Sequence, residues 1–192
     1  MSIWDEMRYG PLGAAVEAAM PQSEADPIGV YAASLAMFSA SISRGVRLEN
    51  GRPVVVWTVL AGRSAIGRKG YALGTAKALI GSGVQGFLNA RTRNGVGSGP
   101  ALVDLLYKTE LTSLATSEDG LDGRVMIEEE EWAGILKVQK KCAKFSTLFR
   151  TASWVELAST LVVYCPPGPV ISMVTRAKTP QVCQTEVVHL LP

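Results

Sequence analysis

The stretch VVVWTVLAGRSAIGRKGYA, residues 54–72, indicates the fold class of the whole chain. Its first seven residues are β-branched or apolar without polar alternation, which is typical of a strand buried on both faces of a parallel sheet. A loop rich in glycine and basic residues follows, and residues 71–83 (YALGTAKALIGSG) favour a helix. Strand, loop and helix in this order form the setting of a phosphate-binding loop, so we expect an α/β protein.

The loop itself departs from the standard phosphate-loop spelling, G-x-x-x-x-G-K-[ST]. Gly62 and Gly67 have the standard spacing, but Arg68 stands between the second glycine and Lys69. A glycine and Tyr71 then follow where a Ser or Thr hydroxyl that holds magnesium is expected. Spacing alone leaves two interpretations open: a loop that binds phosphate at a helix N-terminus, or a surface turn rich in Gly, Arg and Lys.

Four consecutive glutamates form a second chemical signal about sixty residues downstream. The apolar triplet VMI (125–127) predicts a short strand that ends in EEEE (128–131). Carboxylates at a strand end beside the phosphate strand are where NTPases hold magnesium and polarise the attacking water. The alternative is a solvated helix N-terminus, where glutamates interact favourably with the helix dipole.

Further helices and one further strand are expected around these two signals. The clearest helix starts at Asp26, a good N-cap, followed by Pro27, which suits the first helical position. Its apolar and small residues predict that it is largely buried. The sequence predicts helices at residues 10–20, 26–42 and 145–159 and from about Pro100 onward, a turn at 49–53, and a short buried strand at 170–175.

Composition narrows the class of protein and its partners. The 192 residues suit one domain, and a net charge of +2 does not by itself indicate nucleic-acid binding. Three cysteines without a C-x-x-C pair argue against a disulfide scaffold or a structural zinc site. The single histidine, His189, argues against Ser-His or Cys-His catalysis. One local basic patch that could contact DNA comprises Arg63, Arg68 and Lys69. A second comprises Lys137, Lys140, Lys141 and Lys144, which with Arg91 and Arg93 form either a DNA-binding surface or a solvated helix face.

The sequence predicts no membrane partner. The N-terminal segment MSIWDEMRYG is charged, unlike a signal peptide. The longest apolar stretches, residues 28–42 and 154–165, are shorter than a membrane span requires. We therefore expect a cytoplasmic location.

Several segments, in order along the chain, resemble a known family. They include EADPIG (24–29), VLAGRSAIGRKGYA (59–72), RVMIEEEEWAGILKV (124–138), TLFRTASW (147–154) and VISMVTRAKTP (170–180). Their order and spelling resemble the RecA-like P-loop NTPase domain of unknown function found in large helicase- or primase-associated proteins of actinobacterial plasmids, phages and integrated elements. The resemblance spans about residues 9–180, and Arg-Lys-Gly is the family's own form of the loop.

The resemblance implies a RecA-like core, with a mostly parallel sheet flanked by helices and an N-terminal helical segment. Residues 1–192 would then form one domain, in which residues 1–48 supply the N-terminal helices, 49–180 the nucleotide-binding core and 181–192 a C-terminal tail. It also implies ATP and Mg²⁺ as ligands.

The family's motifs suggest roles for individual residues. The acidic pair falls among Glu129, Glu130 and Glu131, which are therefore the catalytic candidates, and Glu130 is the candidate metal ligand. Arg150 matches a family arginine and is either a phosphate or intersubunit contact, or a helix-surface arginine. The expected nucleotide-binding residues are Gly62, Ser64, Gly67, Arg68, Lys69, Gly70 and Arg150.

Departures from the family pattern leave two functions open. Tyr71 and Ala72 replace the family's Thr-Ser, which removes the usual magnesium hydroxyl, and neither Ser64 nor Thr75 has the spacing to replace it. The first hypothesis is an ATP-binding NTPase of phage or plasmid origin, associated with DNA replication or a helicase. The alternative is a degenerate, non-catalytic relative that acts as a structural or assembly module. A homo-oligomer is compatible with both, and DNA binding is a third hypothesis.

Overall fold

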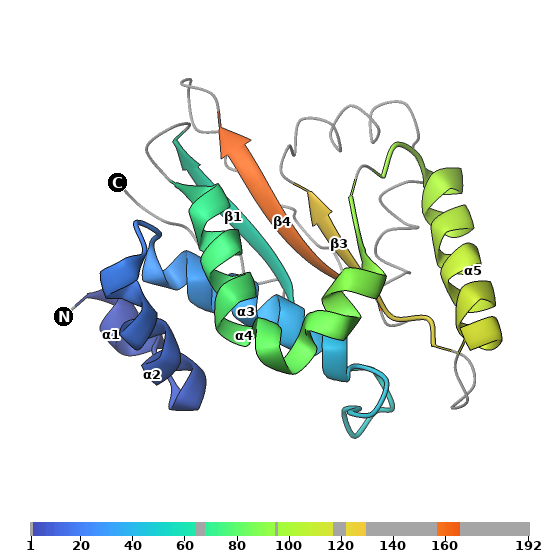
Figure 1. The fold of residues 1–192 in the computed structure, drawn as a ribbon, viewed down its shortest axis with the longest axis horizontal. Coiled ribbons are helices and arrows are strands. Elements are labelled where there is room, and N and C mark those ends of the chain that lie inside the picture. The colour runs from blue at the N-terminus through green and yellow to red at the C-terminus, as the bar shows by residue number, and fades with distance from the viewer. Residues whose placement is uncertain (1, 64–67, 95, 117–121, 130–156, 166–192) are drawn as a thin grey trace, which may run out of the picture.

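A computed structural model of the chain describes residues 2–63, 68–94, 96–116, 122–129 and 157–165 (Figure 1). Within these ranges the fold is mixed α/β, as the sequence predicts, with a small parallel sheet. No helix in this part of the chain is both long enough and apolar enough to cross a membrane. The elements are α1 (Ile3–Met7), α2 (Gly10–Ala19), the 3₁₀ turn η1 (Met20–Gln22), α3 (Pro27–Ile42), β1 (Trp57–Arg63), α4 (Lys69–Arg91), β2 (Thr92–Arg93), α5 (Gly99–Thr116), β3 (Val125–Glu129) and β4 (Leu157–Cys165).

The strands of the described sheet are all parallel, in the order β1-β4-β3-β2. β4 therefore separates β1 from β3 and pairs with both. In the register of the sheet, Glu129 of β3 lies opposite Leu161 of β4, which lies opposite Val59 of β1. Because the strands are parallel, the carboxyl ends of β1 and β3 lie at the same edge of the sheet.

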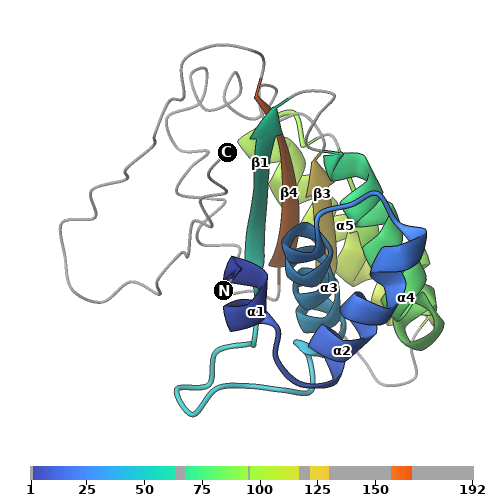
Figure 2. The ribbon, with the colours of Figure 1, turned by 90° about the vertical axis from the view of Figure 1, so that its left-hand side faces the viewer.

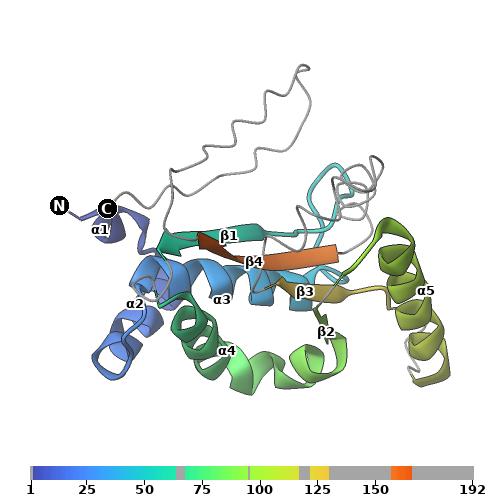
Figure 3. The same ribbon diagram turned by 90° about the horizontal axis from the view of Figure 1, so that it is seen from above.

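Helices α3 and α4 pack on one face of this sheet (Figures 2 and 3). The predicted cap of α3 is confirmed: Oδ1 of Asp26 accepts hydrogen bonds from the backbone N–H groups of Ile28 and Gly29 at 2.8 and 3.3 Å. A Cβ built on Gly29 would lie 3.2 Å from the Cβ of Ala72 on α4. The small residues of α3 therefore allow a close approach of the two helices, and the prediction of a largely buried helix here is confirmed.

The main apolar core lies between these two helices and the sheet. Met37 of α3 and Met126 of β3 are fully buried, and Leu60 of β1 and Leu73 of α4 belong to the same cluster. Burial of each such side chain contributes about 1.5–3 kcal/mol to folding. The core thus fixes the start of α4 relative to β1 and β3.

Strand β1 begins and ends later than the sequence predicts, at Trp57–Arg63 rather than residues 54–60. Its pairing with β4 continues to Arg63, which lies opposite Cys165. Gly62 therefore lies within the strand, opposite Tyr164, and not in the loop after it. Pairing with a neighbouring strand outweighs the weak strand preference of glycine. The hydrophobic periodicity of residues 54–60 alone does not predict this pairing.

Helix α4 is longer than the predicted helix at residues 71–83, because it continues to Arg91. Glycine costs about 1 kcal/mol relative to alanine inside a helix, so Gly83 and Gly86 favour an earlier end. Leu88 is buried in the core beyond these glycines, and tertiary packing of this kind provides most of the stability of protein helices.

The sequence does not predict β2 or β4. Residues 145–159 have a helical pattern, but β4 begins at Leu157, so the helix prediction is wrong for its last three residues. A strand in the middle of a parallel sheet lacks polar alternation, so periodicity does not distinguish its sequence from that of a buried helix. The earlier part of that helix and the strand predicted at 170–175 lie outside the described residues.

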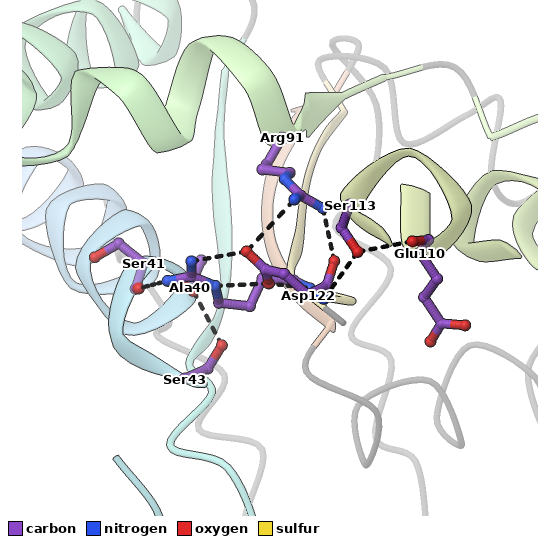
Figure 4. A network of polar contacts seen from close by, with 8 residues as sticks. Ala40, Ser41, Ser43, Arg91, Glu110, Ser113 and Asp122 are labelled. Atoms are coloured by element: carbon purple, nitrogen blue, oxygen red, sulfur yellow. Dashed lines mark hydrogen bonds and ion pairs between the residues drawn. The ribbon is translucent and has the colours of Figure 1, made fainter. Parts of the chain in front are cut away.

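A polar network at the amino end of β3 connects several elements (Figure 4). Arg124 donates from Nε and Nη2 to the two carboxylate oxygens of Asp122, at 2.9 and 2.8 Å, and from Nη1 to the carbonyl of Ser41 in α3. Arg91, at the end of α4, donates to the Asp122 carbonyl at 2.7 Å. The Asp122 N–H donates to Oγ of Ser113 in α5 at 2.9 Å. The network therefore joins α3, α4 and α5 to the start of β3.

Asp122 carries the negative charge of this network. Burial opposes its ionisation, but hydrogen bonds from Arg124 and the charges of Arg124 and Arg91 outweigh that effect and hold the pKa of Asp122 below its usual value. The Asp122 side chain is only 8% exposed. Its arginine partners are themselves largely buried, so removal of one partner would leave an uncompensated charge in the interior.

Candidate functional site

The candidate site lies at the edge of the sheet where β1 and β3 end. β1 ends at Arg63, at this edge, and α4 begins at Lys69. In open parallel sheets, ligands bind outside the carboxyl ends of the strands. β1 and β3 are about 10 Å apart, because β4 lies between them and neighbouring strands are about 4.8 Å apart.

Arg68 is the residue from which α4 starts. It is the N-cap, and its φ of 39° and ψ of 35° lie in the left-handed region, which favours glycine. Its guanidinium forms an ion pair with Glu24, in the segment before α3. Its Cζ lies 5.8 Å from the centre of the Tyr71 ring. Arg68 is therefore held at the helix N-terminus between a carboxylate and an aromatic ring.

The first turn of α4 favours an anion. Lys69 and Gly70 are its first two residues, and no side chain in the described part of the chain caps the helix. The N–H groups of Tyr71 and Ala72 donate to the carbonyl of Arg68 at 3.0 and 3.3 Å. The positive end of the helix dipole and the charge of Arg68 both attract a negative group to this turn.

The predicted nucleotide-binding residues are only partly brought together. Arg68, Lys69 and Gly70 are consecutive at the start of α4. Gly62 lies inside β1, before the connection to that helix. Three of the predicted residues lie outside the described part of the chain: Ser64, Gly67 and Arg150.

Two residues with hydroxyl groups, Tyr71 and Thr75, lie near the first turn of α4. Tyr71 belongs to the first turn of α4 and is 58% exposed. Thr75, one turn later, has its Oγ1 2.7 Å from Oγ of Ser23, in the segment before α3. The Thr75 hydroxyl is thus engaged in joining that segment to α4.

Glu128 faces α4. Its two carboxylate oxygens lie 2.9 and 2.8 Å from Nζ of Lys77, and its side chain is 11% exposed. The ion pair joins the carboxyl end of β3 to the third turn of α4. Glu128 therefore has a structural partner within the core face of the sheet.

Glu129, one of the three catalytic candidates, has a different environment. Successive strand residues point to opposite faces, so its side chain leaves the sheet away from that of Glu128. Its Oε1 accepts a hydrogen bond from the backbone N–H of Val96, in the β2–α5 connection, at 2.8 Å. In register it is level with Val59, about 13 Å along the strand from the end of β1 at Arg63.

The first two of the four glutamates lie in a strand. Glu128 and Glu129 are buried residues of β3, so the alternative of a helix N-terminus is wrong for these two. Glu130 and Glu131, the other catalytic candidates, lie outside the described residues. Among the residues that the structure describes, no group of three His, Cys, Asp or Glu side chains is placed to hold a metal ion. The magnesium site at Glu130 therefore stays a prediction.

The residues suggested for DNA binding are also only partly described. Arg91 has a side chain 15% exposed and engaged by Asp122, so it holds the polar network together. Arg93 donates to the carbonyl of Thr92 at 2.7 Å. The four lysines lie outside the described residues.

Sequence reasoning does not identify the residues that hold the candidate site in place. Glu24 lies in a segment that the family resemblance covers, but its pairing with Arg68 has no local signal. Lys77 and Val96 contact glutamates that are 51 and 33 residues away along the chain. Such contacts become visible only in the folded chain, because they depend on the strand order.

Comparison with protein-family models, with curated proteins and with solved structures gave no match.

Proposed function

We propose that this chain binds ATP at the carboxyl edge of its sheet, as a P-loop NTPase-like protein with a RecA-like core. The observation that carries the proposal is the succession of β1, a short connection and α4, with Arg68, Lys69 and Gly70 at the helix N-terminus. The end of β3, where the glutamates begin, lies at the same edge of the sheet. The order of sequence motifs supports an origin in a phage or plasmid and a role in DNA replication or with a helicase.

The residues at the start of α4 would bind the phosphates. Backbone N–H groups of a first helical turn converge on an anion, and the planar guanidinium of Arg68 suits two parallel hydrogen bonds to phosphate oxygens. Lys69 has the motif position from which a lysine reaches the outer phosphates. Magnesium, where bound through Glu130, would neutralise phosphate charge.

Equilibrium binding of a fluorescent ATP analogue tests this proposal. Lys69→Ala should weaken binding about 10- to 100-fold, because a charge-assisted hydrogen bond contributes about 1.5–3 kcal/mol. Lys108→Ala is the matched control: Lys108 is an exposed lysine of α5, paired with Asp104, and its loss should leave the affinity unchanged. No magnesium-dependent binding at millimolar nucleotide, or equal binding by Lys69→Ala and the wild type, contradicts the proposal.

A second candidate function is that of a non-catalytic assembly module on the same fold. The partners of Glu128 and Glu129 favour it, because Lys77 and the Val96 N–H engage two carboxylates near the candidate site. Steady-state phosphate release separates the two functions. Turnover that falls in Glu129→Gln or Glu130→Gln would exclude the purely structural role, whereas nucleotide binding without turnover would support it.

A further inference from the structure

Arg68 has an anionic partner within the chain. Its ion pair with Glu24 is accessible to solvent, since the two side chains are 46% and 61% exposed. The Tyr71 ring, also exposed, lies near the same guanidinium. A dissolved anion can therefore approach Arg68 without unfolding any part of the core.

The segment that carries Glu24 is fixed on both sides. Before it, Ser23 is hydrogen-bonded to Thr75 of α4. After it, Ala25 is buried and Asp26 caps α3. Glu24 is thus presented to the first turn of α4 by the fold, and its pairing with Arg68 does not depend on a freely moving tail.

We propose that Glu24 is a built-in competitor of phosphate, and that Arg68 exchanges the Glu24 carboxylate for a nucleotide phosphate on binding. This inference rests on the proposed function. A guanidinium binds carboxylate and phosphate in the same forked geometry, so the two anions compete for the same donors. A polyphosphate beside Glu24 would also repel it, which favours exchange over sharing.

The exchange gives a role to two residues at the start of α4. Arg68, which precedes the lysine, is the residue that changes partners. Tyr71 is its support: the ring attracts a guanidinium with either partner, which keeps Arg68 at the helix N-terminus during the exchange. Tyr71 is a positioning residue in this scheme and does not contact the phosphate.

Glu24→Gln tests the proposal, with the fluorescent ATP analogue at low ionic strength. Loss of the competitor should tighten binding about 1.5- to 5-fold, the range that an exposed ion pair supplies. The gain should shrink as salt is added, because salt screens exposed pairs. Glu17→Gln is the matched control: Glu17 is another exposed glutamate, paired with Arg8 on the N-terminal helices, and its loss changes the net charge equally.

A double-mutant cycle separates exchange from simple repulsion. Arg68→Asn removes the cation, and asparagine tolerates the left-handed conformation of this position. In the Arg68→Asn chain, Glu24→Gln should have no effect on affinity. Equal or weaker binding by Glu24→Gln in the wild-type chain, or the same gain in the Arg68→Asn chain, overturns the exchange while the proposed function stands. Absence of ATP binding by every variant overturns the proposed function, and the exchange with it.

Discussion

At the scale of single residues, adjacent glutamates that look alike in the sequence have different partners. Alternation along β3 sends Glu128 to Lys77 on the face of α4 and Glu129 to the Val96 N–H of the β2–α5 connection. The opposite directions of the two side chains follow from the strand conformation, which the sequence predicts. Their partners, Lys77 and Val96, cannot be predicted from the sequence, because the strand order of the whole sheet brings them to β3.

The Lys77–Glu128 pair gives a prediction at this scale. Lys77→Met should lower the free energy of unfolding by about 1–3 kcal/mol, since it leaves a buried carboxylate without its cation. The cost is less than for a fully buried pair because the Lys77 side chain is 42% exposed. Urea unfolding at neutral pH, with the midpoint and slope compared between variants, measures the change.

Two further variants make that prediction specific. Glu128→Gln added to Lys77→Met should restore part of the lost stability, because it removes the unpaired charge. Lys108→Met, at an exposed lysine, should change stability by less than about 0.5 kcal/mol. If Lys77→Met behaves like Lys108→Met, the pair does not stabilise the end of β3.

At the scale of elements, the sequence predicts those that carry local chemical signals. The cap and proline mark the start of α3, and the β-branched run of residues 54–60 overlaps β1. β2 is too short to have a pattern, and β4 takes its strand conformation from its place between β1 and β3. Glycine spacing places Gly62 in the connection between β1 and α4, but strand pairing incorporates Gly62 into β1.

The packing of α3 on α4 can be tested with two glycines. Gly29→Leu should destabilise the chain by about 1–3 kcal/mol or more, because a Cβ there already lies 3.2 Å from Ala72 and a larger side chain overpacks the contact. Gly74→Ala, an exposed position of α4 with no atom within 4 Å of an added Cβ, should stabilise it by about 0.5–1 kcal/mol. Thermal unfolding of both variants checks the signs. A neutral Gly29→Leu would mean that the two helices do not approach this closely.

At the scale of the whole molecule, the carboxyl and amino edges of the sheet have separate roles. The candidate site occupies the carboxyl edge, whereas the Asp122 network connects α3, α4 and α5 to β3 at the amino edge (Figure 4). The residues of the Asp122 network come from distant parts of the sequence, so no sequence motif predicts the network. Substitutions in the network should therefore change stability without a direct effect on the proposed nucleotide site.

The network also predicts how stability depends on pH. A carboxyl whose pKa is lower in the folded chain than in the unfolded one adds stability above its unfolded pKa of about 3.9, and that stability is lost as the pH falls through the lower folded pKa. Asp122→Asn should therefore destabilise the chain by about 2–4 kcal/mol at pH 7, since it leaves Arg124 and Arg91 without their buried anion.

The difference between Asp122→Asn and the wild type should begin to shrink as the pH falls below about 4, because the carboxyl of the unfolded wild-type chain then takes up a proton, and it should be smallest below the lower folded pKa. Urea unfolding of both chains between pH 7 and pH 3 measures this convergence. Asp104→Asn, at an exposed carboxylate of α5, is the control and should follow the wild type throughout. If the difference in the free energy of unfolding stays constant across this pH range, the charge of Asp122 does not contribute to stability, and only its hydrogen bonds do.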